Sequence, residues 1–227
     1  MRLASPRAAA LLATLTMALG GCGERPAPKI ASYLSSPAHL LKFRRVAFVQ
    51  LRDEAAHPTI ARDMTEALFR ALQERRLFHV EVVRRTDPAC SLLPDRLEGR
   101  YTLAELAQIR KALRCDAVLF GTVNTFQPYP RMQIGLYLRL LDLKHGRLVW
   151  SVDHIWDTRD ESTERRVQVY FQEQMRQGYD PVDWHFVTMS PSAFGKFVAY
   201  EIADTLPSGL PSAPRGRSAP RPFWARR

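Results

Sequence analysis

The sequence predicts an α/β (α+β) fold, in which a mixed sheet formed in the order β-α-β-α-β-β-β is packed by helices and followed by C-terminal helices. Three observations support this fold class. Short apolar runs rich in β-branched residues alternate with two segments of helical period. Two neighbouring segments then alternate apolar and polar residues, as the strands of a hairpin do. Two more segments near the C-terminus have helical periodicity, and the second of them also carries helix start signals. The β-α-β-α-β order favours right-handed parallel crossovers, and the hairpin adds antiparallel strands.

The first half of this domain consists of a strand, a helix and a second strand. The run Arg45–Leu51 is almost continuously apolar, as expected of a strand that is buried on both faces. From Pro58 to Arg76 the apolar residues recur at helical spacing, and Pro58 suits a first helical turn. Phe78–Arg84 has the composition of a second strand, and the Pro- and Gly-containing stretch 86–100 is expected to be a loop.

The second half begins with a helix that runs from Thr102 to about Arg114 and opens with the capping-box pattern Thr102-x-x-Glu105. A third apolar strand, Asp116–Val123, follows it. The hairpin strands are Met132–Leu140 and Leu148–Trp156, and alternation places Trp150 on the same face as Leu148 and Val152.

Two C-terminal helices complete the domain. The first covers Glu161–Gln177, and the second begins at a Ser190 cap with Pro191 in its first turn. The single α/β domain is therefore expected to span residues 41–206. Residues 207–227, rich in Pro and Arg, have the composition of a disordered tail.

Residues 1–21 have the features of a secretory signal peptide. Arg2 and Arg7 supply a positive start, and Ala8–Leu19 is a short apolar run that ends in small residues. A transmembrane helix needs roughly 20 apolar residues, whereas the apolar region of a signal peptide needs about 7–15. The sequence therefore predicts export.

Leu19-Gly20-Gly21-Cys22 resembles the lipobox of bacterial lipoproteins, in which the cysteine thiol takes a diacylglyceryl group and becomes the first residue after cleavage. This resemblance implies that Cys22 is the lipidation site and that residues 22–40 form a lipidated tether. By the same resemblance, the absence of Asp at position 23 implies an outer-membrane lipoprotein that faces the periplasm. An ordinary signal peptide followed by a chance cysteine is the alternative.

The formal net charge of +10 would suit a nucleic-acid partner if it were spread over the domain. Most of it comes from seven arginines near the two ends of the chain: Arg2, Arg7, Arg215, Arg217, Arg221, Arg226 and Arg227. The domain between them is only mildly basic, with charges of both signs interspersed. We therefore expect no nucleic-acid partner.

Two cysteines remain beside Cys22. Cys90 and Cys115 could form a disulfide in the oxidising compartment that export would provide. Their spacing alone cannot place them within bridging range, and Cys115 also fits as a small buried residue at the start of a strand. Both interpretations stay open.

The element order resembles that of the periplasmic lipoprotein domains related to CsgG, LpoB and the TolB N-terminal domain. Three segments, within residues 43 to 157, carry the resemblance: Val46–Val49, Cys115–Val123 and Gly146–Ser151. The resemblance implies a non-enzymatic domain that binds partners in the cell envelope. It names no particular partner.

The CsgG relatives also suggest an oligomeric secretion channel. A membrane-spanning hairpin needs strands of about 9–11 residues with an unbroken lipid-facing apolar set. Residues 132–140 come close, but a tight turn and a strand bearing Asp153, His154 and Asp157 follow them. We therefore expect the hairpin to be the edge of a soluble sheet.

Catalytic motifs are missing from the sequence: it contains no nucleophile elbow, phosphate-binding loop, His-Glu-x-x-His or Cys-x-x-Cys. An envelope hydrolase would have to use the densest polar cluster, which consists of Asp153, His154, Asp157, Asp180, Asp183 and His185. Asp153 and His154 point to opposite faces of a strand, so they cannot share one metal ion. We expect no catalytic site, no cofactor and no metal site.

An aromatic-rich stretch, Tyr179–Phe186, separates the two C-terminal helices. Tyr179, Trp184 and Phe186 could anchor a partner, because large aromatic side chains dominate the energetics of protein interfaces. Trp184 and Phe186 could equally fill the core between those helices, which is the interpretation we favour. The sequence therefore predicts a lipid-anchored, non-enzymatic binding or assembly factor of the cell envelope, held at the membrane by its lipid and bound to an envelope protein. A channel subunit and a hydrolase are the alternatives.

Overall fold

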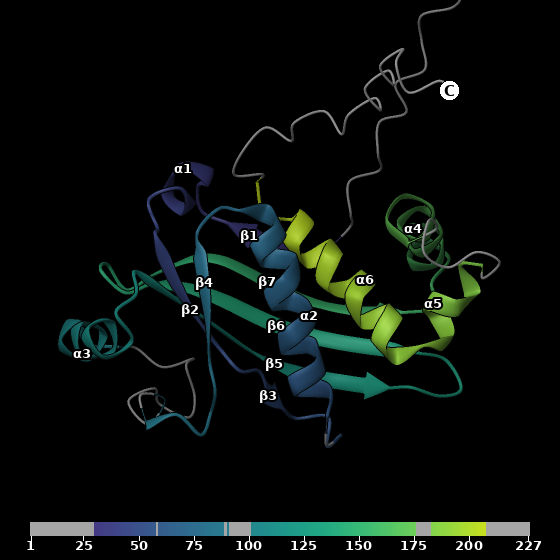
Figure 1. Ribbon diagram of the computed structural model, residues 1–227, viewed down its shortest axis with the longest axis horizontal. Coiled ribbons are helices and arrows are strands. Elements are labelled where there is room, and N and C mark those ends of the chain that lie inside the picture. The colour runs from purple at the N-terminus through teal and green to yellow at the C-terminus, as the bar shows by residue number, and fades with distance from the viewer. Residues whose placement is uncertain (1–29, 58, 89, 91–100, 176–182, 208–227) are drawn as a thin grey trace, which may run out of the picture.

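The computed structural model describes residues 30–57, 59–88, 90, 101–175 and 183–207 (Figure 1). The predicted signal peptide, Cys22, Tyr179 and nearly all of the tail lie outside these residues. The strands are β1 (Ser32–Leu34), β2 (Arg45–Val49), β3 (Arg52–Asp53), β4 (His79–Val83), β5 (Ala117–Gln127), β6 (Gln133–Asp142) and β7 (Arg147–Asp157). The helices are α1 (Pro37–Leu40), α2 (Ile60–Arg75), α3 (Leu103–Leu113), α4 (Glu161–Tyr170), α5 (His185–Met189) and α6 (Pro191–Asp204), and a π-helical turn, η2 (Phe171–Met175), continues α4. None of the described helices is long and apolar enough to cross a membrane.

The strands form one mixed sheet of seven strands in the order β1-β7-β6-β5-β2-β4, with β3 paired to β5. β2 runs parallel to both β4 and β5, as the predicted crossovers require. β5, β6 and β7 are antiparallel neighbours, and β1 adds to β7 in antiparallel fashion. The mixed α/β fold predicted from the sequence is thus confirmed.

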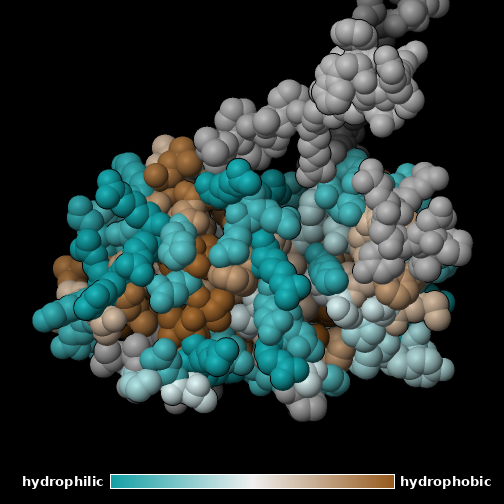
Figure 2. Space-filling view, viewed as in Figure 1, coloured by the Kyte–Doolittle hydropathy of each residue, from teal (hydrophilic) through white to brown (hydrophobic). Residues whose placement is uncertain are grey.

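The main core lies on the face of the sheet that α2 and α6 cross in Figure 1. Its largest fully buried side chains include Trp150, Trp156, Phe194 and Phe197. Figure 2 shows the outer side of this layer, where hydrophilic side chains cover α2. A second, smaller core lies on the opposite face, where Leu106 and Ile109 of α3 pack against β2 and β5. The described sheet is therefore covered by helices on both faces only at the end that includes β2 and β5.

The predicted helix starts are confirmed by their caps. Thr102 and Glu105 form both halves of the capping box, which satisfies two backbone N–H groups at the start of α3. The Ser190 hydroxyl accepts a hydrogen bond from the Ala193 amide, and Pro191 follows in the first turn of α6. The local cap signals in the sequence therefore coincide with the starts of these two helices.

The N-terminal segment and the hairpin register differ from the sequence expectations. Ser32–Leu34 and Pro37–Leu40, placed within the tether by the sequence, form a strand of the sheet and a short helix. A β-bulge in the hairpin also places Leu148 opposite Leu141 and Trp150 opposite Leu140, with Val149 as the extra residue. Val149 and Trp150 are consequently both buried in the main core, and the predicted alternation from Leu148 to Trp150 is wrong at this point.

Candidate functional site

The helices cover the two faces of the sheet unequally. On the face opposite α2 and α6, the core contacts of α3 lie at the β2, β4 and β5 end. Toward β1, β6 and β7 this face carries large side chains in contact with solvent. Tyr33 is 51% exposed and Ile155 is 52% exposed. Exposed apolar surface on an otherwise covered sheet is a candidate contact site for another molecule.

Strand register places several side chains on this part of the sheet. Five of them define what we call the open face: Tyr33, Tyr137, Arg139, Asp153 and Ile155. Tyr33 pairs with Ser151, which pairs with Arg139 of β6, so the three lie in one row across the strands. Tyr137 pairs with Asp153 in the next row, and Gly135 pairs with Ile155 beyond it. Their neighbours along β6 and β7, including Leu136, Leu138 and Trp156, point into the main core. Alternation therefore directs the five toward the open face.

Arg139 is the central charged group of the open face. Its guanidinium carbon lies 4.8 Å from the ring centroid of Tyr137, within the range of a cation–π contact. Its Nε is buried and has no hydrogen-bond partner among the residues that the structure describes. Such a donor costs free energy in the isolated chain and is satisfied if a bound carboxylate or carbonyl reaches it.

A β-bulge shapes the open face beside Ile155. The register between β5 and β6 shifts between Val123 and Thr125, which leaves Asn124 as an extra, exposed residue. A Cβ at position 135 would collide with the Asn124 side chain, so Gly135 is what allows this amide to lie over the sheet. The bulge thereby adds a polar group, the Asn124 amide, next to the apolar side chain of Ile155.

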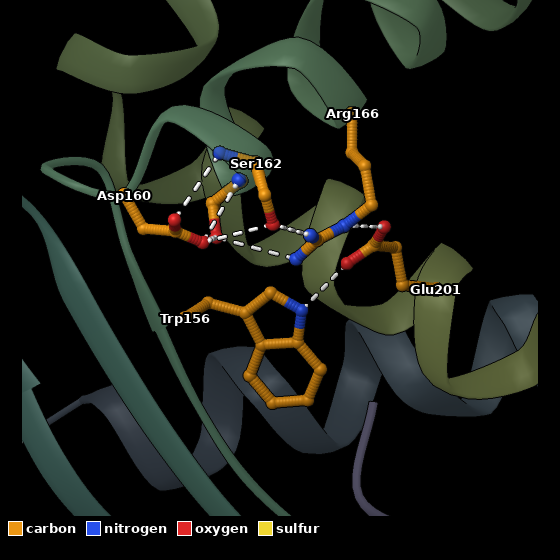
Figure 3. A network of polar contacts seen from close by, with 6 residues as sticks. Trp156, Asp160, Ser162, Arg166 and Glu201 are labelled. Atoms are coloured by element: carbon orange, nitrogen blue, oxygen red, sulfur yellow. Dashed lines mark hydrogen bonds and ion pairs between the residues drawn. The ribbon is translucent and has the colours of Figure 1, made fainter. Parts of the chain in front are cut away.

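A polar network fixes the helices on the other face (Figure 3). Arg166 of α4 donates from Nε to Glu201 of α6 at 2.7 Å, and Trp156 of β7 donates from its indole nitrogen to the other Glu201 oxygen at 2.7 Å. Arg166 also donates to the hydroxyls of Ser162 and Thr163. The network therefore joins β7, α4 and α6 through groups that already bond to one another, which is the arrangement of a structural clamp rather than of a reactive site.

Two carboxyls of this network have shifted pKa values. Burial raises the pKa of Glu201, against the opposing charge of Arg166. Hydrogen bonds from the Ser162 amide and the Thr163 hydroxyl lower the pKa of Asp160, the N-cap of α4, to about 2. Because the Asp160 pKa is lowered, the stability that this cap contributes is present at neutral pH. It is lost progressively as the pH falls from the ordinary range of an aspartate pKa through the lowered value.

The polar cluster that a hydrolase would need is dispersed. Asp153 pairs with Tyr137 and the neighbouring His154 pairs with Leu136, so the two lie on opposite faces, as predicted. Asp157 is bound by Gln133 and Arg159. Asp183 and His185 contact each other at 3.0 Å on the surface. Among the described residues, no three of these side chains lie close enough together to share a metal ion.

The aromatic stretch between the C-terminal helices is partly described. Trp184 and Phe186 are half-buried and pack against the main core, while Tyr179 lies outside the described residues. The Trp184 ring stacks on His185 with centroids 3.8 Å apart, and Met189 at the end of α5 is 78% exposed. These contacts agree with a core-filling role for the two described aromatics, and a docking role stays a prediction.

Cys90 and Cys115 both belong to the α3 side of the sheet. Cys115 is buried in the second core, and Cys90 is half-buried against it. Both thiols are free in the structure, and burial raises the pKa of Cys115 to about 11. A thiol of this kind is unreactive near neutral pH, because little of it is thiolate. Whether Cys90 and Cys115 form a disulfide in the cell stays an open question of the sequence analysis.

Three side chains that the sequence analysis did not connect lie close together at the end of β6. Asp142 Oδ2 lies 3.0 Å from His39 Nε2 and 2.6 Å from His145 Nδ1. Burial alone would raise the pKa of Asp142, but hydrogen bonds from the His145 ring, the Lys144 amide and the His39 ring outweigh it and hold the pKa below its usual range. Only the Asp142-x-x-His145 spacing was visible in the sequence, because His39 is 103 residues away from Asp142.

Comparison with known proteins gives alignments at the level of structure alone. The sequence matches no family model and no curated protein. The PelC dodecamer from Paraburkholderia phytofirmans aligns with a TM-score of 0.42 and 15% identity, over 60% of this chain and 86% of that one. Lipoprotein GNA1162 from Neisseria meningitidis aligns with a TM-score of 0.37 and 15% identity, over 58% of this chain and 98% of that one. The LpoB C-terminal domain from Salmonella enterica aligns with a TM-score of 0.35 and 19% identity, over 48% of this chain and 80% of that one.

Proposed function

We propose that this chain is a lipid-anchored, non-enzymatic binding or assembly factor of the bacterial cell envelope, which presents the open face to a partner protein. The membrane attachment rests on the signal peptide and on the lipobox that ends at Cys22. Several acyl chains on one residue hold a protein at a bilayer stably, because each buried CH₂ contributes about 0.8 kcal/mol. The sorting residue at position 23 favours the outer membrane, with the domain in the periplasm.

The position of the fold along the chain limits where the binding surface can be. The described fold begins at Ile30, and β1 follows within two residues. Seven residues lie between Cys22 and Ile30, and the eight steps of chain that join these two residues span at most about 30 Å when fully extended. A domain on so short a tether stays close to the bilayer, so its partner must be reachable near the same membrane.

The open face is the observation that carries the binding role. It combines two tyrosines and an arginine, which are residue types that interfaces use as anchors, with an exposed isoleucine. The partner chemistry that fits it is a protein surface with an apolar centre and a carboxylate or carbonyl directed at Arg139. This surface is separate from the Trp184 segment, which packs on the helical face.

Cys22→Ala is expected to abolish membrane attachment, because no other thiol stands at the predicted cleavage site to accept the lipid. The measurement is partition into detergent, together with incorporation of labelled palmitate, in the native host. The chain carrying Cys90→Ala is the matched control and should stay lipidated. A Cys22→Ala chain that still takes up palmitate would contradict the anchor.

Photocrosslinking tests the open face. A photoreactive residue at position 33 or 155 should give an adduct of the same mass with one envelope protein, whereas the same residue at position 169 of α4 should not, although Val169 is 45% exposed. Arg139→Gln should lower the yield at position 155 without lowering the melting temperature. Adducts at position 184 only would move the binding site to the aromatic stretch, and adducts with a second copy of the chain would contradict a separate partner.

A further inference from the structure

Among the residues that the structure describes, His39, Asp142 and His145 form a group of side chains that could hold a metal ion. His39 lies on α1, Asp142 ends β6, and His145 lies in the turn that leads to β7. Each side chain offers one ligand atom, and the three atoms lie within 4.8 Å of one another. Two imidazole nitrogens and one carboxylate oxygen form the ligand set that Zn²⁺ and similar transition ions prefer.

We propose that His39 Nε2, His145 Nδ1 and Asp142 Oδ2 bind one divalent transition-metal ion of the Zn²⁺ class. In a tetrahedral Zn²⁺ site the metal–ligand distances are about 2.0–2.2 Å, so neighbouring ligand atoms stand about 3.3–3.5 Å apart. The two contacts on Asp142 Oδ2 now measure 3.0 and 2.6 Å. Each has to lengthen by less than about 1 Å, which small rotations of the imidazole rings provide.

The surroundings hold the carboxylate in place for this role. The other oxygen of Asp142, Oδ1, accepts a hydrogen bond from the Lys144 amide at 2.7 Å, so the turn itself orients the group. Gly146 continues the turn with φ of +65°, a conformation that favours glycine, and this folds the chain back directly after His145. Hydrogen bonds of this kind on a ligand are typical of metal sites.

Burial is graded across the cluster. The Asp142 side chain is 3% exposed, His39 is 25% exposed and His145 is 49% exposed. One side of the cluster is thus closed by protein and the other faces solvent, which gives an ion a route of entry and a place for a bound water. Phe43 packs beside His39 with ring centroids 5.5 Å apart and limits how far that ring can swing away.

The ion would act as a clamp. It would join α1, which leads directly out of β1 and the start of the described chain, to the β6–β7 turn across 103 residues of sequence. Since the ion binds the folded chain and not the unfolded one, it should raise the melting temperature. The proposal does not depend on the open face or on lipidation.

The test uses the full chain in detergent, purified without a polyhistidine tag and dialysed against a chelator before Zn²⁺ is added. We expect one Zn²⁺ per chain by elemental analysis and a higher melting temperature. His39→Gln and His145→Gln should each weaken Zn²⁺ binding by at least about 100-fold, since even the outer partners of a ligand are worth about 10–100-fold. His185→Gln is the matched control, because His185 also contacts a single aspartate at 3.0 Å but has no second histidine there.

Cobalt supplies the second readout. Co²⁺ in place of Zn²⁺ should give the intense visible bands of a four-coordinate site in the original chain and in His185→Gln, and not in His39→Gln or His145→Gln. Melting in chelator checks that each variant is folded, and the exposed His145 is the substitution least able to disturb packing. Stoichiometry well below one Zn²⁺ per chain, or equal affinity in the original chain and both histidine variants, would overturn the proposal and leave the cluster as two hydrogen bonds on one carboxylate.

Discussion

Trp150→Ala is expected to produce a poorly folded, protease-sensitive chain. Trp150 is 1% exposed, and its indole nitrogen donates to the Thr205 hydroxyl at 3.0 Å, so the substitution leaves a large cavity and removes a bond to the end of α6. Truncating a buried tryptophan typically costs about 3–5 kcal/mol of the free energy of unfolding, out of roughly 5–15 kcal/mol in total. Urea denaturation measures the loss.

Trp184→Ala is the matched comparison, since it also removes a tryptophan but from a half-buried position. If Trp184 anchors a partner, its removal should leave stability nearly intact and weaken partner recovery. If it fills the core between α4 and α6, stability should fall. Equal and severe unfolding in both variants would end the hypothesis of an aromatic docking stretch.

Arg166→Leu is expected to destabilise the fold by about 3–5 kcal/mol, because it leaves the Glu201 carboxylate buried without its partner charge. The loss should be smaller at about pH 5 than at pH 8. The pKa of Glu201 is already raised by burial, and a group of that kind favours the folded state when it is protonated and opposes it as the pH rises through the folded pKa. Thermal and urea unfolding at the two pH values measure both effects.

The second variant in this experiment is Arg166→Leu combined with Glu201→Gln. It removes both charges and keeps an oxygen that accepts from the Trp156 indole, so it should recover most of the loss. Arg165→Leu, at the exposed neighbouring arginine, should change the free energy of unfolding by less than about 0.5 kcal/mol. An Arg166→Leu chain as stable as Arg165→Leu would show that the network in Figure 3 contributes little.

The sequence predicted the elements whose signals are local. Continuous apolar runs located β2 and β5, and the Thr102 and Ser190 caps located the starts of α3 and α6. β1 was missed because three residues carry no periodic pattern, and Ser32–Leu34 become a strand only through pairing with β7. The bulge at Val149 was missed for a related reason, since the register of β7 depends on β6.

The candidate sites depend on contacts between distant segments, which no local pattern records. The open face exists because α3 covers only one end of its side of the sheet, and the amphipathic pattern of α3 does not say where along the sheet the helix packs. Asp142 and His145 are adjacent in the turn, but His39 reaches them only through the packing of α1. Six histidines without a repeated spacing gave no sign of this cluster.

Mass spectrometry of the N-terminal peptide, isolated from detergent-extracted protein of the native host, tests the central claim most directly. The mature chain is expected to begin at Cys22 and to carry a diacylglyceryl group on the Cys22 thiol, with the peptide from Gly23 onward of unchanged mass. A chain that begins at another residue, or one that begins at Cys22 with an unmodified thiol, would contradict the lipid anchor and with it the proposed envelope role.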